Sequence, residues 1–235
     1  MRLVVLMMSG LISSVPGPLV LAGESAKAAT KKINSNSVKK EIEQALKPMR
    51  QKEGTSVAIK KRTTNSLLGR EKKSEGRLYY RRGKLRLELK SPEDSLVILD
   101  GKTLWLATKL DEDLGGKTMV TKTSARSLKK SSTLIAALLE NQQLLKEFKV
   151  SARKTDGEEV HLKFTPRLSD GEIQDLQLWL NPKAGRLLKV LYTDDKENEV
   201  EFTLGEPGSL FSGFDSDPDQ IFFYKPPKDA EVTEF

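Results

Sequence analysis

From Gly54 onward the chain alternates apolar and polar positions with a period of two, which is typical of strands with one buried and one solvated face. In "KLRLELK", residues 84–90, leucines alternate with charged residues. Asp-Gly at 100–101 separates two further apolar runs and is a strong hairpin signal. The pattern predicts about ten or eleven antiparallel strands joined by successive hairpins.

Two segments, residues 37–51 and 131–146, have apolar positions at helical spacing instead. We expect Ser37 to cap the first helix, and Ser131 or Ser132 to cap the second. A sheet of this many strands curls because its twist accumulates, and the second helix can then cover the concave side. The space between helix and sheet is either dry core or a ligand cavity. The apolar faces comprise Val38, Ile42, Ala45, Leu46 and Met49 in the first helix and Leu134, Ile135, Leu138, Leu139 and Leu145 in the second.

The first part of the chain has the features of a cleavable secretory signal. Residues 3–22 are almost uncharged and follow Arg2, but Pro-Gly-Pro at 16–18 would break a membrane-spanning helix. Ala26 and Ala28 have the small-x-small spacing of a signal peptidase site. A retained membrane anchor is the alternative. We expect three parts: a secretory signal over 1–28, a linker over 29–36 and a single domain over 37–235.

The chain is basic, with a formal net charge of +7. Its lysines and arginines stand among acidic neighbours, which favours a solvated surface over a nucleic-acid partner and leaves contact with anionic lipid head groups as the functional alternative. No basic strip interleaves with the strand aromatics, so we expect these to line a core or a cavity rather than stack on bases. The aromatics concerned are Tyr79, Tyr80, Trp105 and Trp179.

Groups that could support catalysis or metal binding are few. His161 is the only histidine, and the strand alternation places it on a polar face. The chain has no Gly-x-Ser-x-Gly sequence, so we expect neither a catalytic site nor a cofactor. Residues 215–219 carry three alternating aspartates, as a calcium loop does. Gln220 and Pro226 occupy positions where such a loop needs glycine and a carboxylate, so we expect no metal site.

Three segments together resemble the periplasmic lipoprotein carrier family, LolA. That family has Lys-Arg-Pro-Gly-Lys-Phe-Arg-Trp-Glu, then an apolar strand with Asp-Gly-Lys-x-Leu-Trp, and ends in Phe-x-Phe-x-Pro-Pro. Here the matching segments are "RRGKLRLE" at 81–88, "VILDGKTLWL" at 97–106 and "FFYKPPKDAEV" at 222–232. Their order and spacing extend the resemblance over residues 37–235.

The resemblance implies a mainly β (α+β) fold, an incomplete, strongly curled antiparallel β-barrel of about eleven strands covered by helices, with an apolar cavity between. It also implies a periplasmic chaperone that binds the acyl chains of lipoproteins. The expected partners are acylated lipoproteins as cargo, an inner-membrane lipoprotein-releasing ABC transporter and an outer-membrane lipoprotein receptor. We expect a monomer. The alternative is a periplasmic regulatory domain that senses lipid or lipoprotein on the same scaffold.

In the family a strand arginine hydrogen-bonds to the lid region and holds the empty carrier closed, and the matching position here is Arg82. A solvated cation beside Arg81 is the alternative. The family's proline is missing, so Leu85 takes the position of an aromatic near the cavity mouth and Leu87 replaces the usual tryptophan. The candidates for the cavity lining, each of which could equally be ordinary core, are Leu85, Leu87, Leu89, Leu104, Leu106, Leu134, Leu138, Leu162, Phe164, Leu178 and Leu180.

Leu21-Ala22-Gly23 is followed by Glu24, at the position where a bacterial lipoprotein signal would have its lipid-bearing cysteine. The chain contains no cysteine, so lipidation there is chemically excluded. The family's outer-membrane receptor, LolB, shares the fold but is itself a lipoprotein. The sequence therefore favours an exported, diffusible periplasmic carrier over an anchored receptor.

Overall fold

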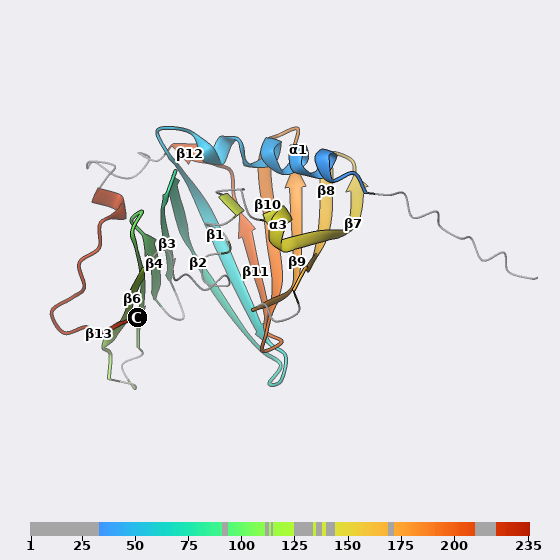
Figure 1. The fold of residues 1–235 in the computed structure, drawn as a ribbon. Coiled ribbons are helices and arrows are strands. Elements are labelled where there is room, and N and C mark those ends of the chain that lie inside the picture. Colours follow the sequence, from blue (N-terminus) through green and yellow to red (C-terminus); the bar gives the residue numbers. More distant parts are fainter. Residues whose placement is uncertain are drawn as a thin grey trace, which may run out of the picture. The chain divides into compact units, whose positions relative to one another are not determined.

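One antiparallel sheet, curled on itself, makes up most of the structure (Figure 1). The computed structural model describes residues 33–90, 94–110, 113, 115–124, 134, 138–139, 144–168, 172–209 and 220–235. Its elements in chain order are α1 (Ser35–Leu46), η1 (Pro48–Arg50), β1 (Thr55–Asn65), β2 (Arg70–Arg81), β3 (Lys84–Lys90), β4 (Ser95–Leu99), β5 (Thr103–Lys109), β6 (Thr118–Ser124), α3 (Leu144–Glu147), β7 (Phe148–Asp156), β8 (Glu159–Pro166), β9 (Ile173–Asn181), β10 (Arg186–Asp194), β11 (Glu199–Leu204), β12 (Gly208–Ser209), η5 (Gln220–Phe222) and β13 (Glu231–Glu234).

The strands follow the order β13-β6-β5-β4-β3-β2-β1-β11-β10-β9-β8-β7, and the short β12 also pairs with β1. Neighbours from β1 to β6 and from β7 to β11 are joined as antiparallel hairpins, as the alternation predicts. The pairing of β1 with β11 unites these two halves. Within the described residues the path ends at β13 and β7, so the sheet is open. The predicted incomplete, curled antiparallel barrel is confirmed.

The register of the strands divides the side chains between the two faces of the sheet. One row across the strands runs from Val57 through Leu78, Leu87 and Val97 to Leu106. These residues lie on the concave face, since Val57, Leu78 and Leu87 share one apolar cluster with the buried residues of α1. The residues between them in sequence face the convex side. Because the alternation has a period of two, this one row assigns every neighbouring position to a face.

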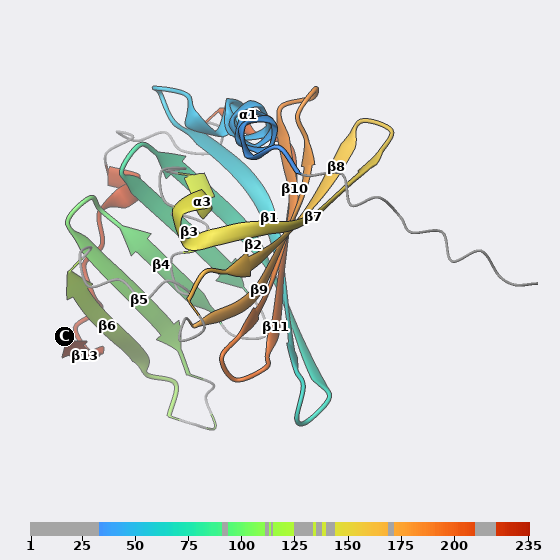
Figure 2. The same ribbon diagram turned by 45° about the vertical axis from the view of Figure 1, so that its right-hand side comes forward.

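Helix α1 lies across the ends of the strands and contacts β9 and β10 (Figure 2). Its buried residues are Val38, Ile42, Ala45 and Leu46, as the helical spacing predicts. The expected cap at Ser37 is wrong by three residues, because the helix begins at Ser35 and Asn34 precedes it. Asn34 is the cap: it has an extended backbone, and its side-chain oxygen accepts a hydrogen bond from the Asn36 N–H at 2.9 Å.

The predicted second helix is described only in part. Leu134, Leu138 and Leu139 are helical, and α3 follows at Leu144–Glu147. We call these seven residues the lid residues. Figure 2 shows α3 on the inner side of the curl, between strands of the two halves. The other calls on this helix, including the caps Ser131 and Ser132, lie outside the described residues.

The C-terminal segment lies on the convex face of β3 to β6. Ile221 and Phe222 pack with Tyr79, and Tyr224 meets Trp105 edge to face, with ring centroids 5.6 Å apart. Strand β13 then pairs parallel to β6. The expectation that Trp105 lines the core or the cavity is therefore wrong, because its side chain points to the convex face. Leu104 and Leu106 point to the concave face, so the residue between them must point away from it.

Candidate functional site

The concave face of the sheet is the candidate binding site. The predicted lining residues are buried, apart from the half-buried Leu106. All of them except Leu104 and Leu106 belong to a single apolar cluster that also contains residues of α1. The structure thus brings strands from both halves of the sheet, α1 and the lid residues together around one apolar interior. Whether that interior opens to admit a ligand is not tested by the packing, so the cavity itself stays a prediction.

Three of the lid residues cover this interior. Leu134, Leu138 and Leu139 are 4%, 1% and 0% exposed, and they belong to the same cluster as the concave strands. Leu144 of α3 is also buried in the cluster. Acyl chains that entered the interior would have to replace these contacts.

Arg50 holds the lid residues through two hydrogen bonds. It ends η1, directly after Met49, which is buried in the apolar cluster. Its Nε donates to the carbonyl oxygen of Leu139 at 2.5 Å, and its Nη2 donates to that of Leu138 at 3.1 Å. Hydrogen bonds from a charged guanidinium to backbone carbonyls are stronger than neutral ones, and its planar fork can reach two carbonyls at once. Arg50 thus ties the segment after α1 to the helical segment over the sheet.

The sequence patterns do not predict the contact of Arg50 with the lid residues. Its only local signal is its position beside Met49, the last residue of the apolar helical face, and nothing nearby indicates acceptors 89 residues further along the chain. Arg82, the predicted lid-closing residue, lies in the turn between β2 and β3, and its side chain is exposed. Gly83 completes this turn with a φ of 76°, a conformation that glycine adopts readily. The lid-closing role of Arg82 stays a prediction.

Helix α1 is tied to the edge strand β7. The Arg153 guanidinium donates to both carboxylate oxygens of Glu41, at 3.1 Å from Nε and 2.6 Å from Nη2. The hydrogen bond to this carboxylate is the main cause of the raised pKa of Arg153. A bidentate pair fixes orientation as well as distance. α1 is therefore held at one end of the concave face independently of the lid residues.

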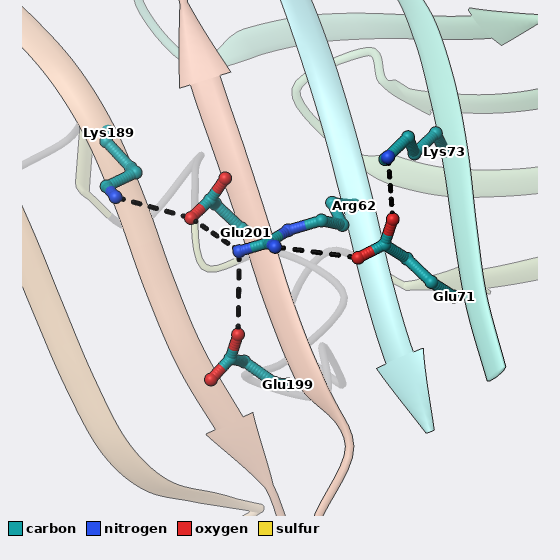
Figure 3. Close-up of polar contacts among 6 residues, drawn as sticks. All are labelled: Arg62, Glu71, Lys73, Lys189, Glu199 and Glu201. Atoms are coloured by element: carbon teal, nitrogen blue, oxygen red, sulfur yellow. Dashed lines mark hydrogen bonds and ion pairs between the residues drawn. The ribbon is translucent and has the colours of Figure 1, made fainter. Parts of the chain in front are cut away.

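The convex face carries a charged network around Arg62, at the junction of β1 and β11 (Figure 3). Arg62 contacts Glu201 at 3.1 Å, Glu71 at 3.5 Å and Glu199 at 3.7 Å. Lys73 and Lys189 extend the network through Glu71 and Glu201. The Glu201 charge is the main cause of the raised pKa of Arg62. The network crosses the pairing that unites the two halves of the sheet, and we assign it a structural role.

His161 lies on this convex face, as predicted. Its ring stacks on Trp179 with centroids 4.2 Å apart, and its Nε2 is 3.0 Å from Gln177 Oε1. The Lys189 ammonium lies 4.0 Å from the centroid of the Trp179 ring. Trp179 is therefore not a lining residue of the concave side, and the expectation for it is wrong. Here the aromatic ring is covered by polar neighbours instead of by core.

The described residues contain no group of three potential metal ligands and no helix long and apolar enough to cross a membrane. The aspartates of the calcium-like sequence at 215–219 lie outside the described residues. The described residues form an apolar surface that the curled sheet encloses. The helical residues that cover it are held by the hydrogen bonds from Arg50. That arrangement is the incomplete, curled barrel covered by helical residues that the family resemblance implies.

The chain belongs to the family of the outer membrane lipoprotein carrier protein LolA, whose model matches residues 50–209. It is 26% identical over 166 residues to an outer-membrane lipoprotein carrier protein of Chromobacterium violaceum, covering 70% of this chain and 74% of that protein. The predicted resemblance is confirmed, and the family is one of binding or carrier proteins.

Solved structures with a similar fold include a LolA superfamily protein from Nitrosomonas europaea, with 12% identity, a TM-score of 0.40, and coverage of 82% of this chain and 98% of that one. A chain of the MucA/MucB complex of Pseudomonas aeruginosa matches with 18% identity and a TM-score of 0.39, over 79% of this chain and 60% of that one. The lipoprotein LppX of Mycobacterium tuberculosis matches with 17% identity and a TM-score of 0.37, over 74% and 96%.

Proposed function

We propose that the protein is a soluble periplasmic carrier, which holds the acyl chains of lipoproteins against its concave face and takes them from the inner to the outer membrane. The observation that supports this most is the single apolar cluster shared by both halves of the sheet, α1 and the lid residues. Family membership supports a lipoprotein as the cargo. In this proposal the lining residues named from the sequence contact the acyl chains.

Burial of the acyl chains supplies the driving force for binding. Each methylene group that leaves water contributes about 0.8 kcal/mol, so the acyl chains of a lipoprotein cannot cross the aqueous periplasm uncovered. The chains would replace Leu134, Leu138 and Leu139 against the sheet. Because apolar contacts are exchanged for apolar contacts, the net affinity stays moderate, and a carrier that must release its cargo requires this.

Arg50 is the residue that we propose holds the empty carrier closed. A hydrogen bond that involves a charged group contributes roughly 1.5–3 kcal/mol, so two of them hold the lid residues closed without preventing opening. Arg82 is the second candidate, carried over from the family's strand arginine. Their positions differ, since Arg50 contacts the lid residues directly and Arg82 lies in an exposed turn.

The proposal includes export, with a signal over 1–28 removed, a linker that ends before Ile33, which packs against the apolar cluster, and a domain from there to 235 that is not lipidated. The carrier would act as a monomer. It would accept cargo from an inner-membrane lipoprotein-releasing ABC transporter and deliver it to an outer-membrane receptor where one is present.

The carrier role is tested by a release assay. Inner-membrane vesicles that contain the transporter and a labelled lipoprotein are incubated with ATP and the purified protein, and the supernatant is analysed for the lipoprotein. We expect release that depends on the protein and rises with its concentration. A lipoprotein whose lipid-bearing cysteine is replaced by serine, anchored in the vesicles by an added transmembrane helix, is the matched control and should stay bound. Absence of release of the acylated form would overturn the proposal.

Depletion of the protein in its host separates the carrier from the alternative, a regulatory domain that senses lipid or lipoprotein. A carrier predicts that lipoproteins accumulate in the inner membrane after depletion. Correct sorting combined with a changed envelope stress response would favour the sensing role instead.

A further inference from the structure

The apolar interior contains a tyrosine side chain on β10. Tyr192, near the end of this strand, is 8% exposed and belongs to the same apolar cluster as the other concave strands and α1. In the register it stands between Leu176 of β9 and Val200 of β11, which are both buried. The tyrosine therefore lies on the concave face with an apolar residue on either side.

The Tyr192 hydroxyl group has no hydrogen-bond partner among the described residues. Asp194, at the end of β10, is already engaged by N–H groups of the following turn: it accepts two hydrogen bonds at Oδ1 and one at Oδ2. The hydroxyl oxygen is also not among the fully enclosed unpaired atoms of the described residues, so a ligand can reach it. Hydroxyl groups that are largely removed from water are paired as a rule, because an unpaired one costs free energy. An acceptor from a ligand would remove this cost.

The surroundings of the hydroxyl group favour a neutral acceptor over an anion. Burial and, to a smaller extent, the charge of Asp194 raise the pKa of Tyr192, so the hydroxyl group stays protonated and can donate. The same carboxylate would repel a phosphate or a free fatty acid, and the apolar interior would penalise either charge. An ester carbonyl oxygen accepts a hydrogen bond without a charge. An amide would bring an N–H group that itself needs a partner.

We propose that the Tyr192 hydroxyl group donates a hydrogen bond to an ester carbonyl of the cargo when its acyl chains occupy the concave face. The inference rests on the proposed function, because the ester enters with the acyl chains. It goes further by naming the residue that recognises how the chains are attached.

The position of Tyr192 also gives the acyl chains a direction. β10 begins beside η1, where a Cβ atom at Gly185 would come within 2.8 Å of the Pro48 side chain. Tyr192 lies seven residues after Gly185 in sequence, towards the other end of the strand. An ester held at Tyr192 therefore leaves the apolar face between it and α1 for the acyl chains.

Calorimetry with two probes tests the contact: dioctanoylglycerol, and dioctylglycerol, in which ether links replace the esters and the carbonyl groups are absent. Each is used below its aggregation limit. The ratio of the two affinities is compared between the wild type and Tyr192→Phe, because this comparison cancels any difference in apolar character between the probes. We expect Tyr192→Phe to weaken binding of the ester by roughly threefold to tenfold, as loss of one neutral hydrogen bond does, and to leave binding of the ether unchanged.

A matched control removes a tyrosine hydroxyl group from the other face of the sheet. The Tyr224 ring packs edge to face against Trp105 on the convex side, with centroids 5.6 Å apart. Tyr224→Phe should leave the ratio of the two affinities at its wild-type value. The same change of ratio in both variants would mean that the effect does not arise at Tyr192, and would overturn the inference.

Infrared spectroscopy observes the hydrogen bond itself. Dioctanoylglycerol with isotope-labelled carbonyl groups is bound to the wild type and to Tyr192→Phe, and its carbonyl stretching band is recorded. We expect the band at lower frequency in the wild type, because a hydrogen bond weakens the C=O bond. A change in packing alone would alter the affinity without moving this band. Identical bands in the two proteins would therefore overturn the contact, whatever the affinities.

The remaining outcomes separate this inference from the proposed function. If both lipids bind and Tyr192→Phe leaves the ratio of their affinities unchanged, the contact with the ester is overturned and the carrier proposal stands. Equal weakening of both lipids would give Tyr192 a packing role only and would likewise overturn the contact. Absence of binding of both lipids to the wild type would overturn the proposed function and this inference with it.

Discussion

Replacement of Arg50 by methionine removes the two hydrogen bonds to the lid residues and keeps most of the aliphatic stem. A hydrogen bond that involves a charged group contributes about 1.5–3 kcal/mol to stability. Because Arg50 is only half-buried, we take the lower value for each of its two bonds, which gives about 3 kcal/mol together. At about 1.4 kcal/mol per tenfold change, the open population of the lid residues should rise about 100-fold. An Arg50→Lys variant can keep one bond and should show a smaller effect.

Hydrogen exchange measured by mass spectrometry reports this opening. We expect amides of Leu144–Glu147 to exchange faster by up to about 100-fold in Arg50→Met, while those of β9 keep their rates. If opening limits binding, the variant should also bind acylated cargo more tightly and pass it on more slowly. Unchanged exchange at the lid residues would mean that Arg50 does not hold them closed. Acceleration of the same size throughout the sheet would contradict that role too, because it would mean global destabilisation.

Three further variants test the roles of Arg82, Tyr192 and Arg62. Arg82→Leu should slow the release of cargo if Arg82 has the lid-closing role of the family's strand arginine. Unchanged release in the vesicle assay would favour the alternative, that Arg82 is a solvated surface cation. Burial, with a smaller contribution from Asp194, raises the pKa of Tyr192 to about 12. The folded state therefore holds this proton more tightly than the unfolded chain, so the stability that this group contributes is complete below pH ~10 and falls by roughly 2 kcal/mol as the pH rises to ~12. Denaturant unfolding across this range should show the fall in the wild type and a smaller one in Tyr192→Phe; equal curves would contradict the burial of the hydroxyl group. Arg62→Met should lower the free energy of unfolding by only about 1 kcal/mol, because the partly exposed network is screened by water, and the difference should shrink in high salt. A loss that high salt leaves unchanged would contradict this interpretation.

The strand pattern could be predicted because a period of two is a local property that survives whatever packs against the sheet. Leu85, Leu87 and Leu89 face the concave side in the structure as the alternation requires. The same rule correctly places His161 on the opposite face. Local periodicity therefore determines the two faces of each strand, and the register then joins them into one apolar interior.

Most of the structure that the sequence does not predict lies where distant segments meet, and the helix cap is a local exception. Trp105 is covered by Tyr224, which follows it by more than a hundred residues, so a large aromatic on the convex face is shielded without belonging to the concave core. The partners of Arg50 are backbone carbonyls, which carry no sequence signature. The cap at Asn34 depends on a backbone conformation that a neighbouring serine could also have provided. Sequence patterns indicate which face is buried, but not which segment covers it.

We propose that this protein recognises the acyl chains of a lipoprotein and not its polypeptide. Native mass spectrometry of the purified protein mixed with one lipoprotein in two forms, acylated and with its lipid-bearing cysteine replaced by serine, tests it most directly. We expect a one-to-one complex with the acylated form alone, and a loss of that complex when an excess of free diacylglycerol competes. Equal complexes with both forms, or none with either, would contradict it.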